Sequence, residues 1–224
     1  MKRLSLLELI VPFLEAREDV LACWEGGSAA FGAVDELSDI DLQAVVSDDR
    51  VGAVSDALEC FLASQIGIDA TYHVPQPSWH GHTQAFYLFK DTSPFHMLDF
   101  VLIKESVREP RFLEPERHGK ARMLFDKGGF VDISNLDWNA HNATLQLRKK
   151  IVVDSFRVMH WLVDKEIERK RSVDAIHFHI NLVMPKLIEL LRIQHCPERH
   201  DFGFRYLARD LPPQIYAQVE PLFY

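Results

Sequence analysis

Two short apolar segments flank a Gly-Gly-Ser turn near the start of the chain, and this arrangement limits the folds available to it. Residues 20–24 have the length and composition of a buried strand. Residues 40–46 alternate between apolar and polar side chains and then become fully apolar, as a half-buried strand does. Further strands are expected at residues 68–74, 85–89 and 95–103, and a helix at residues 51–64. The first part of the chain is therefore predicted to be an α/β segment with a mixed sheet.

The second part of the chain has a different periodicity. From about Leu136, long helical periods cover residues 142–170 and 172–195, and a shorter one follows Pro212. These periods predict a helical bundle.

Two segments before Leu136 are less regular. Residues 4–17 predict an amphipathic helix in which Pro12 delays the start or causes a kink. Residues 105–129 are rich in charge, proline and glycine, which favours a linker or an excursion over the surface. The predicted architecture is thus an α+β domain at 1–134, with the linker from about 105, and a helical domain at 135–224.

Composition and charge exclude several classes of function. The net charge is −8 at pH 7, whereas nucleic-acid binders usually show a basic excess or stripe, so no nucleic-acid partner is expected. The apolar runs are short and interrupted by charge, so neither a signal peptide nor a membrane segment is expected. Cys23, Cys60 and Cys196 are odd in number and far apart, which favours reduced thiols. We therefore expect a soluble cytoplasmic protein that does not act at a membrane.

Asp39 and Asp41 lie two residues apart at the start of a predicted strand. Because successive side chains of a strand point to opposite faces, both carboxylates share one face while Ile40 and Leu42 enter the core. Two carboxylates this close repel each other unless a cation or a shared proton intervenes. They suit Mg²⁺, which binds through one or two carboxylates plus substrate phosphates. The pair alone also fits two solvated aspartates at a strand end.

The Gly-Gly-Ser turn adds a candidate phosphate site. Gly26 and Gly27 let the backbone approach a ligand closely. Ser28 is expected in the first turn of a short helix, where free N–H groups favour a phosphate. The turn is therefore predicted to hold a triphosphate while the aspartates hold its metal ion. By itself, the triplet is equally typical of a plain turn.

A third carboxylate, Asp99, lies inside the apolar segment "FHMLDFVLIK". Its apolar neighbours are Met97, Leu98, Phe100 and Val101, so both faces of this strand are expected to be buried. An uncompensated charge there would be costly. Asp99 is therefore predicted to be paired or metal-bound, either as a further ligand of a two-metal site or in a salt bridge to a lysine or arginine.

The segment "GGSAAFGAVDELSDIDL" resembles the signature of the nucleotidyltransferase superfamily related to DNA polymerase β. In that superfamily a Gly-Ser turn precedes an Asp-x-Asp strand, and a third carboxylate follows on a later strand. The match covers residues 28–41 and includes Gly32, Asp35 and Ser38. The resemblance extends over residues 20–104.

The helical second half is more loosely similar to the C-terminal domain of the aminoglycoside and lincosamide nucleotidyltransferase branch. The stretch "RYLARDLP", residues 205–212, adds to this similarity. In that reading the helical domain closes the active-site cleft and shapes the acceptor pocket.

The resemblance implies transfer of a nucleoside monophosphate from a nucleoside triphosphate to an acceptor hydroxyl, with release of pyrophosphate. Two Mg²⁺ ions would be held by Asp39, Asp41 and Asp99. The β- and γ-phosphates would be held by Gly27, Ser28 and Ser38, with ATP as the expected donor. The hydroxyl proton would be taken by Asp99, by a residue of the helical domain or by a second subunit.

A small-molecule acceptor is expected because the chain lacks a basic stripe, and an aminoglycoside or lincosamide antibiotic is one class that the resemblance suggests. Two other functions stay open. One is a protein AMP-transferase of the toxin–antitoxin kind, which would modify a tyrosine or serine of a partner. The other is a nucleotide-binding module that has lost transfer, although the three aspartates count against it. Some members of the aminoglycoside branch build their site across a dimer, so the resemblance also allows a homodimer.

Overall fold

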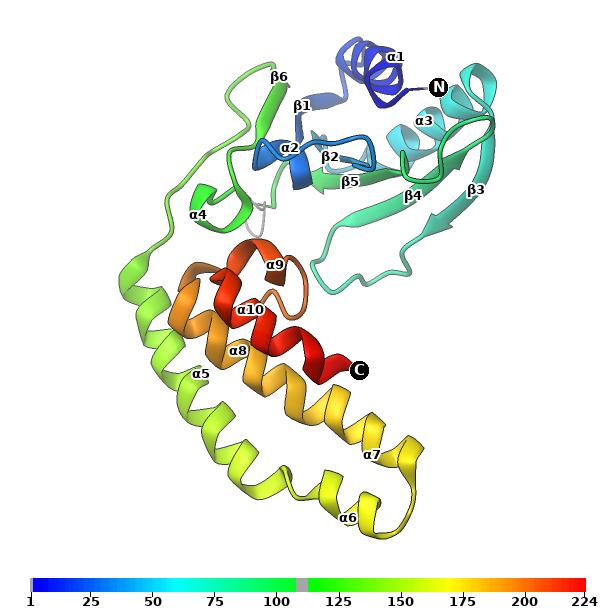
Figure 1. Ribbon diagram of the computed structural model, residues 1–224. Helices are drawn as coiled ribbons and strands as arrows, with labels where there is room; N and C mark the ends of the chain where they lie inside the picture. Colours follow the sequence, from blue (N-terminus) through cyan, green and yellow to red (C-terminus); the bar gives the residue numbers. More distant parts are fainter. Residues whose placement is uncertain (1, 108–112) are drawn as a thin grey trace. The chain divides into compact units, whose positions relative to one another are not determined.

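The computed structural model describes residues 2–107 and 113–224, and the chain divides into two compact units, Met1–Asn135 and Leu136–Tyr224. The first unit contains a six-stranded sheet with flanking helices, and the second is helical (Figure 1). The predicted α+β fold, a mixed sheet with flanking helices followed by a helical bundle, is confirmed.

The elements of the first unit are α1 (Arg3–Glu15), β1 (Val20–Glu25), α2 (Gly27–Ala30), β2 (Ile40–Val46), α3 (Val51–Gln65), β3 (Ile68–His73), β4 (Thr83–Phe89), β5 (Leu98–Lys104), α4 (Pro115–His118) and β6 (Arg122–Asp126). The strand order is β3-β4-β5-β2-β1-β6. β2 and β5 are parallel, and the other neighbouring strands are antiparallel. The sheet is therefore mixed, and its parallel pair lies at the centre.

The segment predicted as a linker, residues 105–129, contains a strand that the sequence analysis missed. β6 lies in this segment and pairs with β1 at the edge of the sheet, with Cys23 opposite Phe125. An edge strand has a neighbour on one side only, so its sequence needs little apolar alternation. Of the five residues of β6 only Phe125 is buried. Residues 108–112 of the predicted linker lie outside the described residues.

One face of the sheet packs against α1 and α3. Along β2, the residues Ile40, Leu42, Ala44 and Val46 point to this face and belong to its buried core. From α1 the same core contains Leu6, Leu7, Ile10 and Leu14. From α3 it contains, at helical spacing, Val54, Leu58 and Leu62. This packing fixes the register of β2, since a shift by one residue would move the apolar set to the other face.

The opposite face of the sheet carries a smaller apolar cluster. From β2 this cluster takes Val45, and from β5 it takes Val101 and Ile103. All three residues lie at least two positions after Asp41 or Asp99 along their strands. The starts of β2 and β5 on this face are therefore left to polar side chains.

Helix α1 begins at Arg3, so the expectation that Pro12 delays its start is wrong. Pro12 lies inside the helix, in its last turn, and on its exposed face. A proline removes one backbone hydrogen bond, but the carbonyl that loses its partner belongs to the exposed residue Glu8, where water can replace the bond. The buried face with Leu6, Ile10 and Leu14 stays continuous.

The elements of the second unit are α5 (Trp138–Met159), α6 (Leu162–Glu168), α7 (Ser172–Phe178), the π-helical η1 (His179–Val183), α8 (Met184–His195), the 3-10 turn η2 (Pro197–Arg199), α9 (Leu207–Asp210), α10 (Pro213–Val219) and the 3-10 turn η3 (Glu220–Phe223). The start of α5 is fixed by Asp137, whose carboxylate accepts hydrogen bonds from the N–H groups of Asn139 and Ala140. The continuous helical period predicted over residues 142–170 is divided in the structure, because α5 ends at Met159 and α6 begins at Leu162. The π-helical turn η1 directly precedes α8, which has Pro185 in its first turn.

The helical unit has its own apolar core, in which α8, α9 and α10 meet. Its buried members include Met184 and Ile188 of α8, Leu207 of α9 and Val219 of α10. No helix in the described part of either unit is both long and apolar enough to cross a membrane.

Candidate functional site

Two of the predicted site aspartates lie side by side on neighbouring strands. The parallel register of β2 and β5 places Asp41 opposite Asp99, and Asp39 directly precedes β2. Ile40 and Leu42 are fully buried in the core on the other face, as the alternation requires. Three carboxylates from two segments 60 residues apart are thus gathered at the start of two strands.

Asp41 and Asp99 lie in an environment that disfavours their ionised forms. Burial, followed by the neighbouring charges of Asp39 and Asp99, raises the pKa of Asp41 to about 7. Burial also raises the pKa of Asp99 to about 6, against a hydrogen bond from Gln84 that lowers it. No lysine or arginine among the described residues forms a salt bridge with any of the three carboxylates. A bound cation would relieve this repulsion.

The Gly-Gly-Ser turn lies directly against Asp41. The backbone N–H of Gly26 donates to the Asp41 carbonyl at 2.9 Å. Gly27, the first residue of α2, has a φ of +51°, and a Cβ added there would lie 1.7 Å from Asp41 Oδ2. Only glycine combines that backbone conformation with so close an approach to the carboxylate. The turn and the aspartates therefore form one structural unit, which the sequence analysis predicted as two adjacent sites.

Gly27→Ala is expected to disturb the Gly-Gly-Ser turn and the neighbouring Asp41 more than Gly32→Ala does. Gly32 also has a positive φ, +64°, but a Cβ there meets nothing within 4 Å. Both variants carry the cost of the left-handed backbone, about 1–2 kcal/mol, and only Gly27→Ala also displaces Asp41. Urea unfolding and nucleotide binding of both variants check this. Equal losses of stability and binding in the two variants would show that the contact with Asp41 has no role.

Ser28 follows Gly27 in the first turn of α2. Its Oγ is buried, and it has no hydrogen-bond partner among the described residues. A buried hydroxyl without a partner is uncommon and costs free energy, which a ligand oxygen would recover. Ser28 is therefore available as a donor beside the carboxylates.

Ser38, the other serine predicted to bind phosphate, is already engaged. Its hydroxyl donates to Asp35 Oδ1 at 2.8 Å and accepts from the backbone N–H of Asp35 at 2.9 Å. Asp35 also accepts from the N–H of Leu37. In this structure Ser38 closes the loop that leads into β2, and its one hydroxyl proton is directed at Asp35 rather than at a ligand.

Beneath the aspartates, the sequence analysis missed a buried ion pair. Glu25, the last residue of β1, is fully buried and forms salt bridges with Arg3 of α1 and with Arg122 of β6. Arg3 Nε also donates to the backbone carbonyl of Asp39 at 2.9 Å. Arg3 thus ties α1 to the segment that carries Asp39, and its charge favours the ionised form of Asp41. In the sequence, the position of the charged residue Glu25 directly after the predicted strand 20–24 was the observation that could have indicated a buried ion pair.

A second missed residue contacts the third carboxylate. Gln84 of β4 donates from Nε2 to Asp99 Oδ1 at 2.7 Å. The predicted alternatives for Asp99 were a metal ion or a basic partner, and the described residues supply an amide instead. A neutral donor leaves the carboxylate able to bind a cation.

These residues form an incomplete ligand set. Within residues 2–107 and 113–224, no three histidine, cysteine, aspartate or glutamate side chains are arranged to hold a metal ion by themselves. Mg²⁺ fits such a set, because it usually binds through one or two carboxylates and keeps phosphate and water as its other ligands. The oxygen-only chemistry of the three aspartates also favours a hard cation over zinc.

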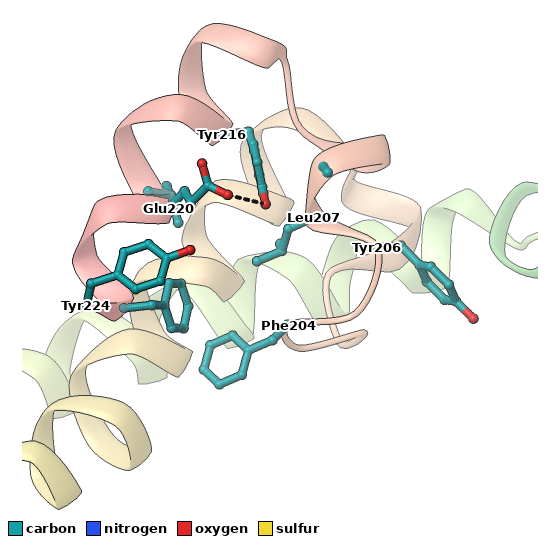
Figure 2. A pocket seen from close by; sticks show the side chains of 9 residues that line it. Phe204, Tyr206, Leu207, Tyr216, Glu220 and Tyr224 are labelled. Atoms are coloured by element: carbon teal, nitrogen blue, oxygen red, sulfur yellow. Dashed lines mark hydrogen bonds between the residues drawn. The ribbon is translucent and has the colours of Figure 1, made fainter. Parts of the chain in front are cut away.

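The helical unit carries a pocket of about 420 Å³ with an aromatic lining, shown in Figure 2. Its lining residues are Phe204, Tyr206, Leu207, Ala208, Tyr216, Val219, Glu220, Phe223 and Tyr224. Tyr216 Oη donates to Glu220 Oε1 at 3.2 Å. Among these lining residues only Glu220 has a charged side chain at neutral pH. Aromatic rings around a carboxylate favour a ligand that is apolar and positively charged.

No protein-family profile and no curated protein sequence matches this chain. Its structure is similar to a solved structure described as the GLD-2/RNP-8 complex, at 10% identity and a TM-score of 0.34, over 86% of this chain and 56% of that chain. It is also similar to the STING-associated CdnE c-di-GMP synthase from Capnocytophaga granulosa, at 12% identity and a TM-score of 0.34, over 97% of this chain and 63% of that chain. The chain thus spans less than two thirds of either of these two structures.

Proposed function

We propose that this chain is a Mg²⁺-dependent nucleotidyltransferase, which transfers a nucleoside monophosphate from a nucleoside triphosphate to a hydroxyl of a small molecule and releases pyrophosphate. The observation that supports this most is the register of β2 and β5, which pairs Asp41 with Asp99. Asp39 directly precedes β2, and no basic side chain of the described residues forms a salt bridge with the three. The raised pKa values of Asp41 and Asp99 are typical of carboxylates in sites that bind a ligand or a metal.

In this proposal the side chains of Asp39, Asp41 and Asp99 hold two Mg²⁺ ions. When bound, Mg²⁺ neutralises charge on the triphosphate and makes the acceptor hydroxyl a better nucleophile. The Ser28 hydroxyl donates to a phosphate oxygen, because it is the buried donor without a partner in the turn. Gly27 leaves room for the turn beside Asp41. Ser38 contributes indirectly, by closing the loop that precedes Asp39.

The acceptor is proposed to be a small cationic molecule rather than a nucleic acid. The net charge of −8 disfavours a polyanion. The aromatic pocket with Glu220 has the matching chemistry for an organic cation. Amine-bearing antibiotics such as aminoglycosides and lincosamides are the first acceptors to test, with ATP as the first donor.

The deciding experiment has two stages. Calorimetric titration of the wild type with each of the four ribonucleoside triphosphates, with and without Mg²⁺, identifies the donor. Pyrophosphate release is then measured with small-molecule acceptors and with protein substrates. Metal-dependent binding followed by transfer to a small molecule supports the proposal. Nucleotide attached to a protein would indicate a protein AMP-transferase, and metal-dependent binding without transfer to any acceptor would indicate a binding module.

Ser28→Ala is expected to raise the KM for the triphosphate about tenfold, with a smaller effect on kcat. A hydrogen bond to a charged group contributes about 1.5–3 kcal/mol, and a bond made equally in the ground state and the transition state appears in KM. Ser64→Ala, at an exposed serine near the end of α3, is the control and should change neither constant. A fall in kcat with an unchanged KM would contradict ground-state phosphate binding by Ser28.

A further inference from the structure

A chain of hydrogen-bonded side chains leads from Asp99 into the loop between β3 and β4. Gln84 Nε2 donates to Asp99 Oδ1 at 2.7 Å, and Gln84 Oε1 lies 3.1 Å from Nε2 of His80. In the antiparallel register Gln84 lies opposite Val101, so Gln84 is the diagonal neighbour of Asp99 on the same face of the sheet. The contact therefore follows from strand pairing and does not depend on a chance encounter of surface side chains.

The direction of each hydrogen bond in this chain is determined by its neighbours. The backbone N–H of His82 donates to His80 Nδ1 at 3.1 Å, so Nδ1 is an acceptor. The proton of the neutral imidazole is then on Nε2, which donates to the carbonyl oxygen of Gln84. The amide nitrogen of Gln84 consequently faces Asp99. His80 and Asp99 therefore both require the same orientation of the Gln84 amide.

The loop that carries His80 is itself held in place. Both His80 and His82 are buried. The carbonyl of His82 accepts from Ser78 Oγ at 2.6 Å and from Gln76 Nε2 at 3.2 Å. Side-chain bonds to the backbone in a short loop restrict its conformations. The imidazole is therefore supported by a framework that includes the loop backbone.

We infer that Gln84 is a positioning residue that holds one oxygen of the Asp99 carboxylate and directs the other toward the Mg²⁺ site, and that His80 orients Gln84 for this role. The inference rests on the proposed function. Because β5 lies between β4 and β2, the hydrogen bond from Gln84 holds Asp99 Oδ1 on the side away from Asp41 and leaves Oδ2 available to a cation on the side of Asp41. Groups that orient a metal-binding side chain commonly contribute 10–100-fold to metal affinity or activity.

Three variants of the full chain test the inference. Gln84→Met keeps the length of the side chain but removes its hydrogen bonds. His80→Leu removes the donor to Gln84, whereas His80→Gln keeps a donor nitrogen at a similar reach. The matched control is Gln65→Met at the exposed end of α3. The primary readout is the affinity for Mn²⁺ in the presence of the triphosphate, measured by electron paramagnetic resonance of the unbound ion, and the second is the Mg²⁺ concentration that gives half-maximal turnover.

Gln84→Met is expected to weaken Mn²⁺ binding about tenfold or more. His80→Leu should weaken it less, His80→Gln should bind nearly as the wild type does, and Gln65→Met should not differ from the wild type. If the main effect of His80 on the metal site passes through Gln84, the double variant Gln84→Met/His80→Leu should equal Gln84→Met alone. Additive losses in the double variant would overturn the role assigned to His80.

The result distinguishes this inference from the proposed function. If the wild type binds Mn²⁺ and Asp41→Asn does not, the metal site exists, and unchanged affinity in Gln84→Met would then overturn the inference alone. A lower unfolding temperature of Gln84→Met without any loss of affinity would show that Gln84 only supports the fold. If the wild type does not bind the ion with any triphosphate, the proposed function and the inference both fail.

Discussion

Asp41→Asn is expected to reduce Mg²⁺-dependent nucleotidyl transfer by at least about 10³-fold. Asp41 lies between the other two carboxylates, opposite Asp99 and two residues after Asp39. Asparagine keeps the size of the side chain but offers one neutral carbonyl oxygen in place of a charged carboxylate, which a hard cation such as Mg²⁺ binds poorly. Metal ions supply several kcal/mol of transition-state stabilisation, and each 1.36 kcal/mol corresponds to about tenfold in rate. Single-turnover kinetics at saturating triphosphate and Mg²⁺ would measure the loss.

The same substitution is expected to stabilise the folded chain at neutral and higher pH. The pKa of Asp41 is raised from 3.8 to about 7 in the fold, chiefly by burial. Its protonated form is therefore favoured in the folded state, and the wild type loses stability as the pH rises from about 4 to 7. Asparagine does not ionise, so the unfolding temperature of Asp41→Asn should exceed that of the wild type by several degrees at pH 8 without metal. At pH 4 the two should differ little.

These opposite effects on activity and stability separate a functional carboxylate from a structural one. Asp69→Asn, at an exposed aspartate of β3, is the control and should change neither property. If Asp41→Asn lost activity and also unfolded more easily at pH 8, the loss of activity would follow from damage to the fold. Full activity of Asp41→Asn would refute the metal assignment.

The residues that could be placed from the sequence are those whose positions follow from local periodicity. The strand 40–46 was predicted with the bounds that the structure gives it, because Ile40 and Leu42 alternate with polar residues and then join an apolar run. That alternation also puts Asp39 and Asp41 on one face. The strand that carries Asp99 was predicted to begin at residue 95, three residues before its start at Leu98. Register, however, is a property of two strands, and the pairing of Asp41 with Asp99 could be known only from the structure.

The residues that the sequence analysis missed act across strands. Gln84 is an ordinary polar residue on a half-buried strand, and nothing in its neighbours along the chain indicates that it faces Asp99. Arg3 directly precedes the predicted helix 4–17 and was assigned no role, although it is the basic partner of the buried Glu25. β6 was missed because a short edge strand between charged residues resembles a linker in composition. In each case the determining contact joins residues that are far apart in the sequence.

Contacts between distant residues also explain residues 205–212 of the helical unit, which contribute to the resemblance described above. Two residues of the stretch 205–212, Arg205 and Asp210, form hydrogen bonds with Arg192 of α8, whose side chain is fully buried. Arg192 Nη1 bonds Asp210 Oδ2 at 2.8 Å, Nε donates to the carbonyl of Gly203 at 2.9 Å, and Nη2 donates to the carbonyl of Arg205. The stretch therefore has a clear structural role, which is to satisfy a buried guanidinium.

Asp210→Asn is accordingly expected to destabilise the helical unit by about 3–5 kcal/mol. Removing one partner of a buried ion pair leaves the other charge uncompensated, and such losses are among the largest for single substitutions. Asp210 also accepts from Arg199 at 3.2 Å and from Arg209 at 3.0 Å, so one substitution deprives three arginines of a carboxylate. Hydrogen exchange of the amides of α8 should become faster by about a hundredfold or more, while that of β2 in the other unit should not change.

Asp154→Asn provides the matched control, because Asp154 pairs with Lys150 at 2.5 Å on the exposed side of α5. An exposed pair of this kind contributes little to stability, because water screens both charges. Arg192→Met should be no milder than Asp210→Asn, since it also leaves the carbonyls of Gly203 and Arg205 without their donor. If the amides of α8 exchanged no faster in Asp210→Asn than in Asp154→Asn, the carboxylate of Asp210 would not stabilise Arg192, and the structural role given to residues 205–212 would be refuted.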